Sequence, residues 1–482
     1  MNSSGFTRRE TLKVLGLLGA GGMWGSPQAW ALPSVQSPAS EQPTEVRRQI
    51  FAKVWQTPLV DTHEHLPDEQ DCLRGPGGKP QEDWTVILRH YLDSDLITAG
   101  MPKDQHEQFF RKPLSPLEKW RLLAPYWPAV KNTGYGQAVR IAIRELYGVE
   151  DLSEKTVEKV AAQYETVRRP GFYERILCEL AKIDSCQVNT GTFRESRQPL
   201  LLLQDISIVG MFAGPNLQAF GQPTGIQVKS LVDWYRVIDW WFDRYGKYAT
   251  AVKSQNAYAR NIDYEKIPRE RAEPVFAKRI AGQPISPEEQ KLLEDHLFWY
   301  AVGKATEHGL PVKLHTGYYA GQNSMPLGRV QGNPAAACEL CRLSPQTTFV
   351  FMHICYPYYE DLISIAKQYT NAYVDMCWSW IINPVAAKDF LKKYLVTAPA
   401  NKIFTFGGDY FPVEPVLGHA LIARQGIALS LCELVEEGWL SLEDALSLVD
   451  PIMHENARRV FRIEEKKQAL RSAPWARRPL PP

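Results

Sequence analysis

The sequence predicts an α/β fold, a (β/α)8 TIM barrel with large helical insertions. Eight short β-rich runs recur along the chain, and helix-like segments separate the later ones, as expected for a parallel sheet. The chain has 482 residues, whereas such a barrel needs about 250, so long additions must accompany the eight units. A hydrophobic content of 44% and a charged content of 23% are typical of globular proteins and exclude a disordered chain.

The predicted strands are runs of aliphatic, β-branched or aromatic residues with turn-forming residues at their ends. From the fifth strand onward they alternate with helix-like segments at 334–343, 359–368 and 384–394. This alternation favours a barrel over an antiparallel sheet. The predicted strands cover residues 59–62, 185–189, 206–211, 249–253, 312–315, 348–353, 372–376 and 403–406.

Two insertions account for much of the extra length. Residues 67–171 follow the first strand, and residues 264–300 follow the fourth, both with helical patterning. Each insertion leaves the carboxyl end of a strand, where barrels of this kind place their active sites. The insertions are therefore either lids over a substrate or a packing collar around the barrel.

The first 31 residues have the features of an export signal. Arg8 and Arg9 precede a short, glycine-rich apolar stretch that cannot span a bilayer, and Ala29 and Ala31 form a small-x-small cleavage site. The segment resembles a twin-arginine signal, which implies recognition by the twin-arginine export machinery and a periplasmic location. The mature barrel would then cover residues 32–482.

The charge balance limits the partners. Lys and Arg total 55 against 54 Asp and Glu, so the chain has no basic field to bind nucleic acid or an anionic membrane. Of the eight cysteines, Cys338 and Cys341 lie one helical turn apart but have no second pair to complete a zinc ribbon. We expect a small-molecule substrate and no stable membrane span, and the composition is compatible with a homo-oligomer.

The strongest chemical signal ends the first predicted strand. Side chains alternate across a strand, so His63 and His65 point one way and Glu64 points the other. Three later strands also end in metal-ligand types, namely His315, His353 and Asp409. Because parallel strands bring their carboxyl ends together in a barrel, these side chains can meet around one axis.

At these residues the chain resembles the amidohydrolase superfamily, in particular its amidohydrolase-related (amidohydrolase 2) branch. The branch also contains decarboxylases and hydratases. Further residues that carry the resemblance are Asn333-Pro334, His353-Ile354-Cys355-Tyr356-Pro357, Gly407-Gly408-Asp409 and Glu455-Asn456-Ala457-Arg458-Arg459-Val460-Phe461.

The resemblance implies a divalent metal, with zinc as the preferred ion, held by His63, His65, His315 and Asp409. Asp409 would also accept a proton from the metal-bound water, and His353 would stabilise the developing oxyanion from a second shell. Lys253 lies where binuclear relatives carry a metal-bridging lysine. It would serve either a second metal ion or a substrate carboxylate, and we favour a single ion.

The resemblance therefore favours a metal-dependent hydrolase that acts on an amide, lactam, lactone or related bond of a carboxylated or cyclic substrate. The alternatives on the same scaffold are a nonoxidative decarboxylase or hydratase and an enzyme like uronate isomerase; a non-catalytic periplasmic binding protein is the non-enzymatic alternative. Sugar-acid isomerases share the large insertions but generally lack the fifth-strand histidine ligand, so His315 counts against them. Candidate substrate-binding residues near strand ends are Arg260, Tyr318, Arg329 and Trp378.

Overall fold

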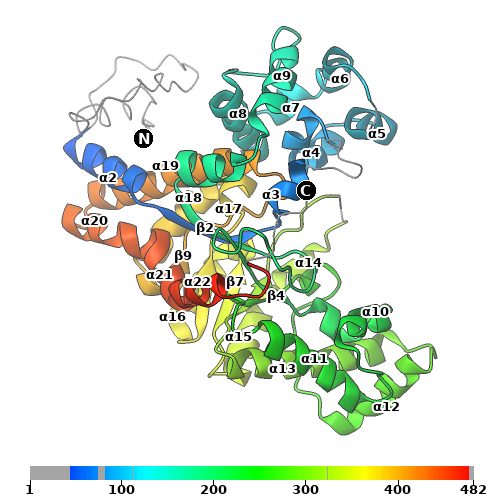
Figure 1. The fold of residues 1–482 in the computed structure, drawn as a ribbon. Coiled ribbons are helices and arrows are strands. Elements are labelled where there is room, and N and C mark those ends of the chain that lie inside the picture. Colours follow the sequence, from blue (N-terminus) through cyan, green and yellow to red (C-terminus); the bar gives the residue numbers. More distant parts are fainter. Residues whose placement is uncertain (1–43, 74–81, 112, 323, 477–482) are drawn as a thin grey trace.

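The structure, a computed structural model, is a parallel β-barrel with helices around it and helical additions at its sides (Figure 1). It describes residues 44–73, 82–111, 113–322 and 324–476, so the predicted export signal lies outside the described residues. The strands are β1 Leu59–Glu64, β2 Ile183–Val188, β3 Leu202–Gln204, β4 Ile206–Ser207, β5 Val252–Ser254, β6 Val312–His315, β7 Phe349–Met352, β8 Ala372–Asp375 and β9 Ile403–Phe404.

All neighbouring strands pair in parallel, in the orders β1-β2-β3 and β4-β5-β6-β7-β8-β9. The two sheets are continuous at Asp205, since its N–H donates to Val188 O at 3.0 Å while β4 pairs with β5. At the other edge, Thr62 N donates to Phe406 O at 3.1 Å, which joins β1 to the segment after β9. β3 and β4 together form one barrel strand, and the predicted eight-stranded barrel is confirmed.

The third predicted strand differs from the observed one. It was expected at 206–211, but the extended segment begins at Leu202, and the 3-10 helix η4 Val209–Phe212 replaces its second half. The strand changes partners at Asp205, whose buried carboxylate accepts hydrogen bonds from Lys313 and Thr250 inside the barrel. Asp205 is a polar residue within an apolar run, so the sequence did not indicate that the strand begins as early as Leu202.

Helices that follow the later strands agree with the predicted segments and surround the barrel. The longest, α19 Glu414–Glu436, is apolar enough to span a membrane, but 78% of its most apolar window is buried inside the protein. It is therefore a core helix. The helices of the barrel layer are α2 Glu45–Gln56, α11 Leu231–Tyr245, α13 Pro287–Glu307, α15 Asn333–Leu343, α16 Tyr359–Gln368, α17 Ser379–Ile382, α18 Pro384–Leu395, α20 Leu442–Asp450, α21 Asn456–Val460 and α22 Ile463–Arg471.

The additions form two helical lobes, which lie at the upper right and the lower right of the barrel in Figure 1. The lower lobe contains α10 Leu217–Gly221 and α12 Arg269–Ile280 beside α11 and α13. In the upper lobe, α8 Gly134–Tyr147 packs against α19 of the barrel layer. The upper lobe follows β1 and contains α3 Glu69–Leu73, η2 Trp84–Leu88, α4 Leu92–Thr98, α5 Lys103–Arg111, α6 Pro116–Leu123, α7 Trp127–Val130, α8 Gly134–Tyr147 and α9 Val157–Val167.

Candidate metal centre and substrate cavity

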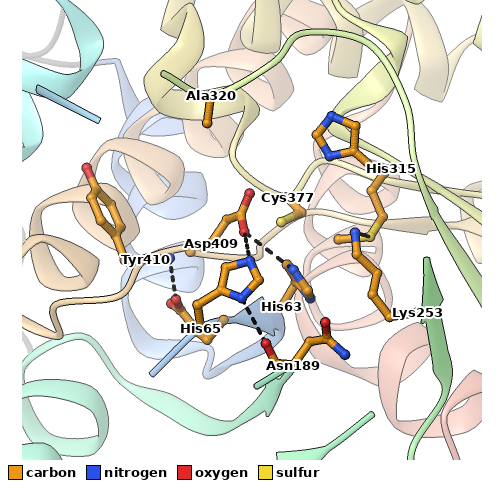
Figure 2. Close-up of polar contacts among 12 residues, drawn as sticks. His63, His65, Asn189, Lys253, His315, Ala320, Cys377, Asp409 and Tyr410 are labelled. Atoms are coloured by element: carbon orange, nitrogen blue, oxygen red, sulfur yellow. Dashed lines mark hydrogen bonds and ion pairs between the residues drawn. The ribbon is translucent and has the colours of Figure 1, made fainter. Parts of the chain in front are cut away.

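Three side chains converge at the carboxyl ends of β1 and β9. The Nε2 atoms of His63 and His65 lie 3.4 and 3.2 Å from Oδ1 of Asp409 (Figure 2). The alternation of side chains along the chain at β1 produces this arrangement: His63 and His65 point to one side, and Glu64, which lies between them in sequence, points to the other. Two imidazoles and a carboxylate are the ligand types and the number that a catalytic zinc site uses.

Hydrogen bonds on the far side of two imidazole rings fix the direction of their Nε2 atoms. Nδ1 of His65 lies 2.8 Å from Asn189 O, and Nδ1 of His353 lies 3.0 Å from Cys377 O. A carbonyl that accepts from Nδ1 orients the ring, and in the neutral ring Nε2 is then the lone-pair donor that a metal ion requires. Burial lowers the pKa of His353 to about 4 and the pKa of His63 well below its ordinary value, so both rings stay neutral.

Asp409 is held by its backbone as well as by its carboxylate. Its φ of 59° lies in the left-handed region, and its N–H donates to His63 O at 2.8 Å. The amides on either side donate to carboxylates of β1: Gly408 N to Asp61 at 3.2 Å and Tyr410 N to Glu64 at 2.6 Å. The first strand therefore supplies two candidate ligands and also fixes the third.

The charge state of Asp409 follows from the same neighbours. Burial alone would raise its pKa, but the hydrogen bond with His65 and the interactions with His63 and His353 hold the pKa well below its ordinary value. Asp409 is thus ionised at neutral pH, which metal binding requires. His353 completes the group, since its Nε2 faces Asp409 Oδ2 at 4.0 Å and has no hydrogen-bond partner among the described residues.

A cavity of about 220 Å³ opens above these groups. Its wall is mostly imidazole, phenol, amide and amine, which suits a small substrate with several oxygen atoms. The lining residues are His63, His65, His90, Tyr91, Lys253, Gln255, Tyr258, His315, Ala320, His353 and Asp409.

His90 is a cavity residue that the strand-end motifs of the sequence did not predict. It belongs to the upper lobe, and its Nδ1 accepts a hydrogen bond from Phe411 N at 3.2 Å. Its ring meets the ring of His65 edge-on at 5.8 Å. No strand end or spacing marks His90, because the folding of the insertion alone brings it to the cavity.

His315 lines the cavity but does not join the converging group. Its Nε2 lies 2.9 Å from the carbonyl oxygen of Tyr318, and its ring packs 4.4 Å from that of His353. The predicted four-ligand set is thus a three-ligand set in this conformation, with His315 turned toward the loop that follows its own strand.

Lys253 is a buried cation without a carboxylate partner among the described residues. It is fully buried, and its Nζ donates to the thioether sulfur of Met352 at 2.9 Å. Burial lowers its pKa to about 8, while the charge of Asp409 opposes that shift. Lys313, on the neighbouring strand, is by contrast paired with Asp205 at 2.8 Å.

The four predicted substrate-binding residues lie outside the cavity wall. Arg260 is paired with Asp295 at 2.6 Å, and Arg329 donates to the carbonyl oxygen of Tyr258. Trp378 is fully buried and stacks on Tyr91, and Tyr318 packs against the Trp378 ring at a centroid distance of 5.9 Å. Lys253 is consequently the one Lys or Arg side chain among the described cavity residues.

Comparison with known proteins agrees with this architecture. Residues 281–463 match the amidohydrolase family model, which supports membership of the amidohydrolase-related superfamily. The chain is 26% identical over 200 residues to protein FluG of Emericella nidulans, covering 40% of this chain but only 22% of that protein's length. It is 21% identical over 476 residues to the uronate isomerase of Corynebacterium efficiens, covering 90% of this chain and 99% of the relative.

Among solved structures, the glucuronate isomerase of Caulobacter crescentus superimposes with a TM-score of 0.70 at 16% identity. The match covers 90% of this chain and 96% of that one. This likeness establishes the fold, a TIM barrel with large helical insertions. Together, the domain match and the curated relatives indicate an enzyme.

Proposed function

We propose that this chain is a metal-dependent enzyme that interconverts the aldose and ketose forms of a small sugar acid. The observation that carries the proposal is the cavity itself, where the three-ligand group lies beside one unpaired buried cation. The uronate isomerases that align with nearly the whole chain support the same reaction class. His315, which counted against an isomerase, lies turned away from the three-ligand group.

The residues fit a divalent metal, and we propose zinc held by His63, His65 and Asp409. The Nε2 atoms of His63 and His65 face the same oxygen of the Asp409 carboxylate, and two imidazoles with one carboxylate are a donor set that catalytic zinc uses. When bound, the ion would polarise the substrate carbonyl and acidify the adjacent hydroxyl.

The protein supplies the remaining chemistry. In this isomerisation the proton on carbon 2 moves to carbon 1, and the proton of the carbon 2 hydroxyl moves to the carbonyl oxygen of carbon 1, so a basic group must lie near both carbons. We assign that group to Asp409, which is ionised and whose Oδ2 faces Nε2 of His353 at 4.0 Å, beyond hydrogen-bond distance. His90 accepts from Phe411 through Nδ1, which leaves its Nε2–H to donate to a substrate oxygen.

Lys253 would bind the carboxylate of the acid. A buried ammonium without an anionic partner costs free energy, and a substrate carboxylate removes that cost. Replacing Lys253 by Met keeps the length and the apolar packing of the side chain but removes the charge. Since hydrogen bonds to charged groups contribute about 1.5–3 kcal/mol, we expect KM for a sugar acid to rise on the order of 10- to 100-fold, with a smaller change in kcat.

The decisive experiment incubates the zinc-loaded chain with D-glucuronate and D-galacturonate and follows ketose formation by NMR. In D2O the transferred hydrogen should be partly replaced by deuterium, because a carboxylate that carries the proton can exchange it with solvent. Absence of ketose from every uronate would overturn the proposal.

Hydrolysis of an amide, lactam or lactone bond is the second candidate. It is favoured by the amidohydrolase match, since residues 281–463 include His315, His353 and Asp409. Turnover of lactones or N-acyl amino acids without any isomerisation of uronates would establish this reading instead.

We also propose that the chain is exported through the twin-arginine pathway. The paired Arg8 and Arg9 and the cleavage triplet that ends at Ala31 support this location. Substituting both arginines by lysine should retain the folded enzyme in the cytoplasm. Undiminished periplasmic enzyme would contradict the proposal.

A further inference from the structure

A second group of potential ligands shares Asp409 with the first. A ring nitrogen of His353, Sγ of Cys377 and a carboxylate oxygen of Asp409 all lie within 4.8 Å of one another. All three residues are buried, and Figure 2 shows the Cys377 side chain beside the Asp409 carboxylate. Nitrogen, sulfur and oxygen donors together are typical of a site for zinc or cobalt rather than for magnesium or calcium.

The unpaired nitrogen of His353 is the independent sign of a missing ligand. Its Nδ1 is bound to the Cys377 carbonyl, so the Nε2 lone pair is fixed toward Asp409 Oδ2. The separation of 4.0 Å is too long for a hydrogen bond. It approaches the spacing of about 3.3 Å between two ligands on one tetrahedral ion with bonds of about 2.0–2.1 Å.

Cys377 is held in place for this role. Its N–H donates to Asp375 at 2.9 Å, and its side chain packs so closely on Gly407 that a Cβ there would lie 2.8 Å from the sulfur. Gly407 lies two residues before Asp409 in the same loop. The sulfur therefore has a fixed position relative to the carboxylate.

We propose that His353, Cys377 and Asp409 form a second metal-ion site that shares the Asp409 carboxylate with the first site. Binding would replace the proton on the Cys377 thiol by the metal ion and release that proton to solvent. The inference rests on the proposed function in one respect. A metal ion on Oδ2 of Asp409 would prevent that oxygen from acting as the base, so excess metal should inhibit isomerisation.

The test titrates cobalt(II) into the metal-free full-length chain and records its absorption spectrum. We expect two equivalents to bind, the second with a near-ultraviolet thiolate-to-cobalt charge-transfer band. Cys377→Ser should bind one equivalent without that band and should resist inhibition by excess metal. Cys432→Ser, a buried cysteine on α19 away from the cavity, is the matched control and should behave as wild type.

His353→Asn provides a second, independent variant, which should also lose the second equivalent and keep the first. Binding of a single equivalent without the band in the wild type, or an unchanged band in Cys377→Ser, would overturn the second site while leaving the first site intact. Binding of no cobalt at all would overturn both the second site and the proposed metal-dependent function.

Discussion

Glu64 is the buried residue whose replacement best tests how the metal centre is built. Its Oε2 accepts the hydrogen bond from Tyr410 N at 2.6 Å, next to the left-handed backbone of Asp409. Glu64→Ala would leave this amide unpaired in a fully buried position, at about 1–3 kcal/mol, and would add a cavity term. We expect a loss of unfolding free energy of about 2–4 kcal/mol by these two effects together.

The larger effect should fall on metal affinity. Asp409 would lose one of the contacts that fix its backbone, and removal of such an outer-shell contact typically weakens metal binding by about 10- to 100-fold. Chelator competition measures this affinity, and urea unfolding of the metal-free chain measures the stability. Metal affinity within about threefold of wild type in Glu64→Ala would refute the reasoning.

Glu64→Gln is the matched control. Burial and the neighbouring Asp61 raise the pKa of Glu64 well above its ordinary value, which favours the neutral carboxyl group that glutamine resembles in shape and charge. A glutamine keeps an oxygen to accept from Tyr410 N and a donor toward Asp61. We expect near-wild-type stability and affinity; a loss equal to that of Glu64→Ala would show that the carboxyl charge matters rather than the acceptor.

Three further predictions follow from the same site. His63→Ala, His65→Ala and Asp409→Asn should each remove the metal of the first site together with activity, and full occupancy in all three by metal analysis would contradict the assignment. Gly408→Ala should lower the free energy of unfolding in urea by more than about 2 kcal/mol, because its Cβ would lie 1.8 Å from Glu64 Oε1. Adding Glu64→Ala to the same chain should restore part of that free energy. Burial raises the pKa of Asp375 from 3.8 to about 7, so between these pH values the folded state binds more protons than the unfolded state. The unfolding free energy of the metal-free chain should therefore fall as the pH rises, by up to about 1.4 kcal/mol per pH unit. Asp375→Asn should flatten this slope in unfolding measured from pH 4 to 7, and an unchanged slope would exclude Asp375 as its source.

The barrel and the convergence of its histidines could be predicted because both follow from local rules. A strand of period two sets His63 and His65 on one side, and the parallel order of β1, β7 and β9 brings His353 and Asp409 to the same end. These rules say nothing about rotamers. His315 ends β6 as predicted, yet the carbonyl of Tyr318 in the following loop takes its Nε2.

Hydrophobic periodicity could not predict which residues the insertions bring to the cavity, or which charged residues they pair with a partner elsewhere. Arg260 faces Asp295 because α13 packs beside it, and no periodicity in the sequence announces that ion pair. His90 reaches the cavity 25 positions after His65, through the tertiary packing of the upper lobe. Long-range packing therefore places His90 in the cavity wall and keeps Arg260 out of it.

The upper lobe is more than a packing collar, because it is hydrogen-bonded to the loop that carries Asp409, the proposed metal ligand. Tyr91 donates its hydroxyl proton to the carbonyl oxygen of Asp409, and His90 accepts from the amide of Phe411. The Tyr91 ring itself packs against the rings of Tyr135 of α8 and Trp378, at centroid distances of 5.0 and 4.9 Å. A shift of the lobe would therefore change the backbone of Asp409 as well as the wall of the cavity, so substrate fit and metal geometry are coupled through the same few hydrogen bonds.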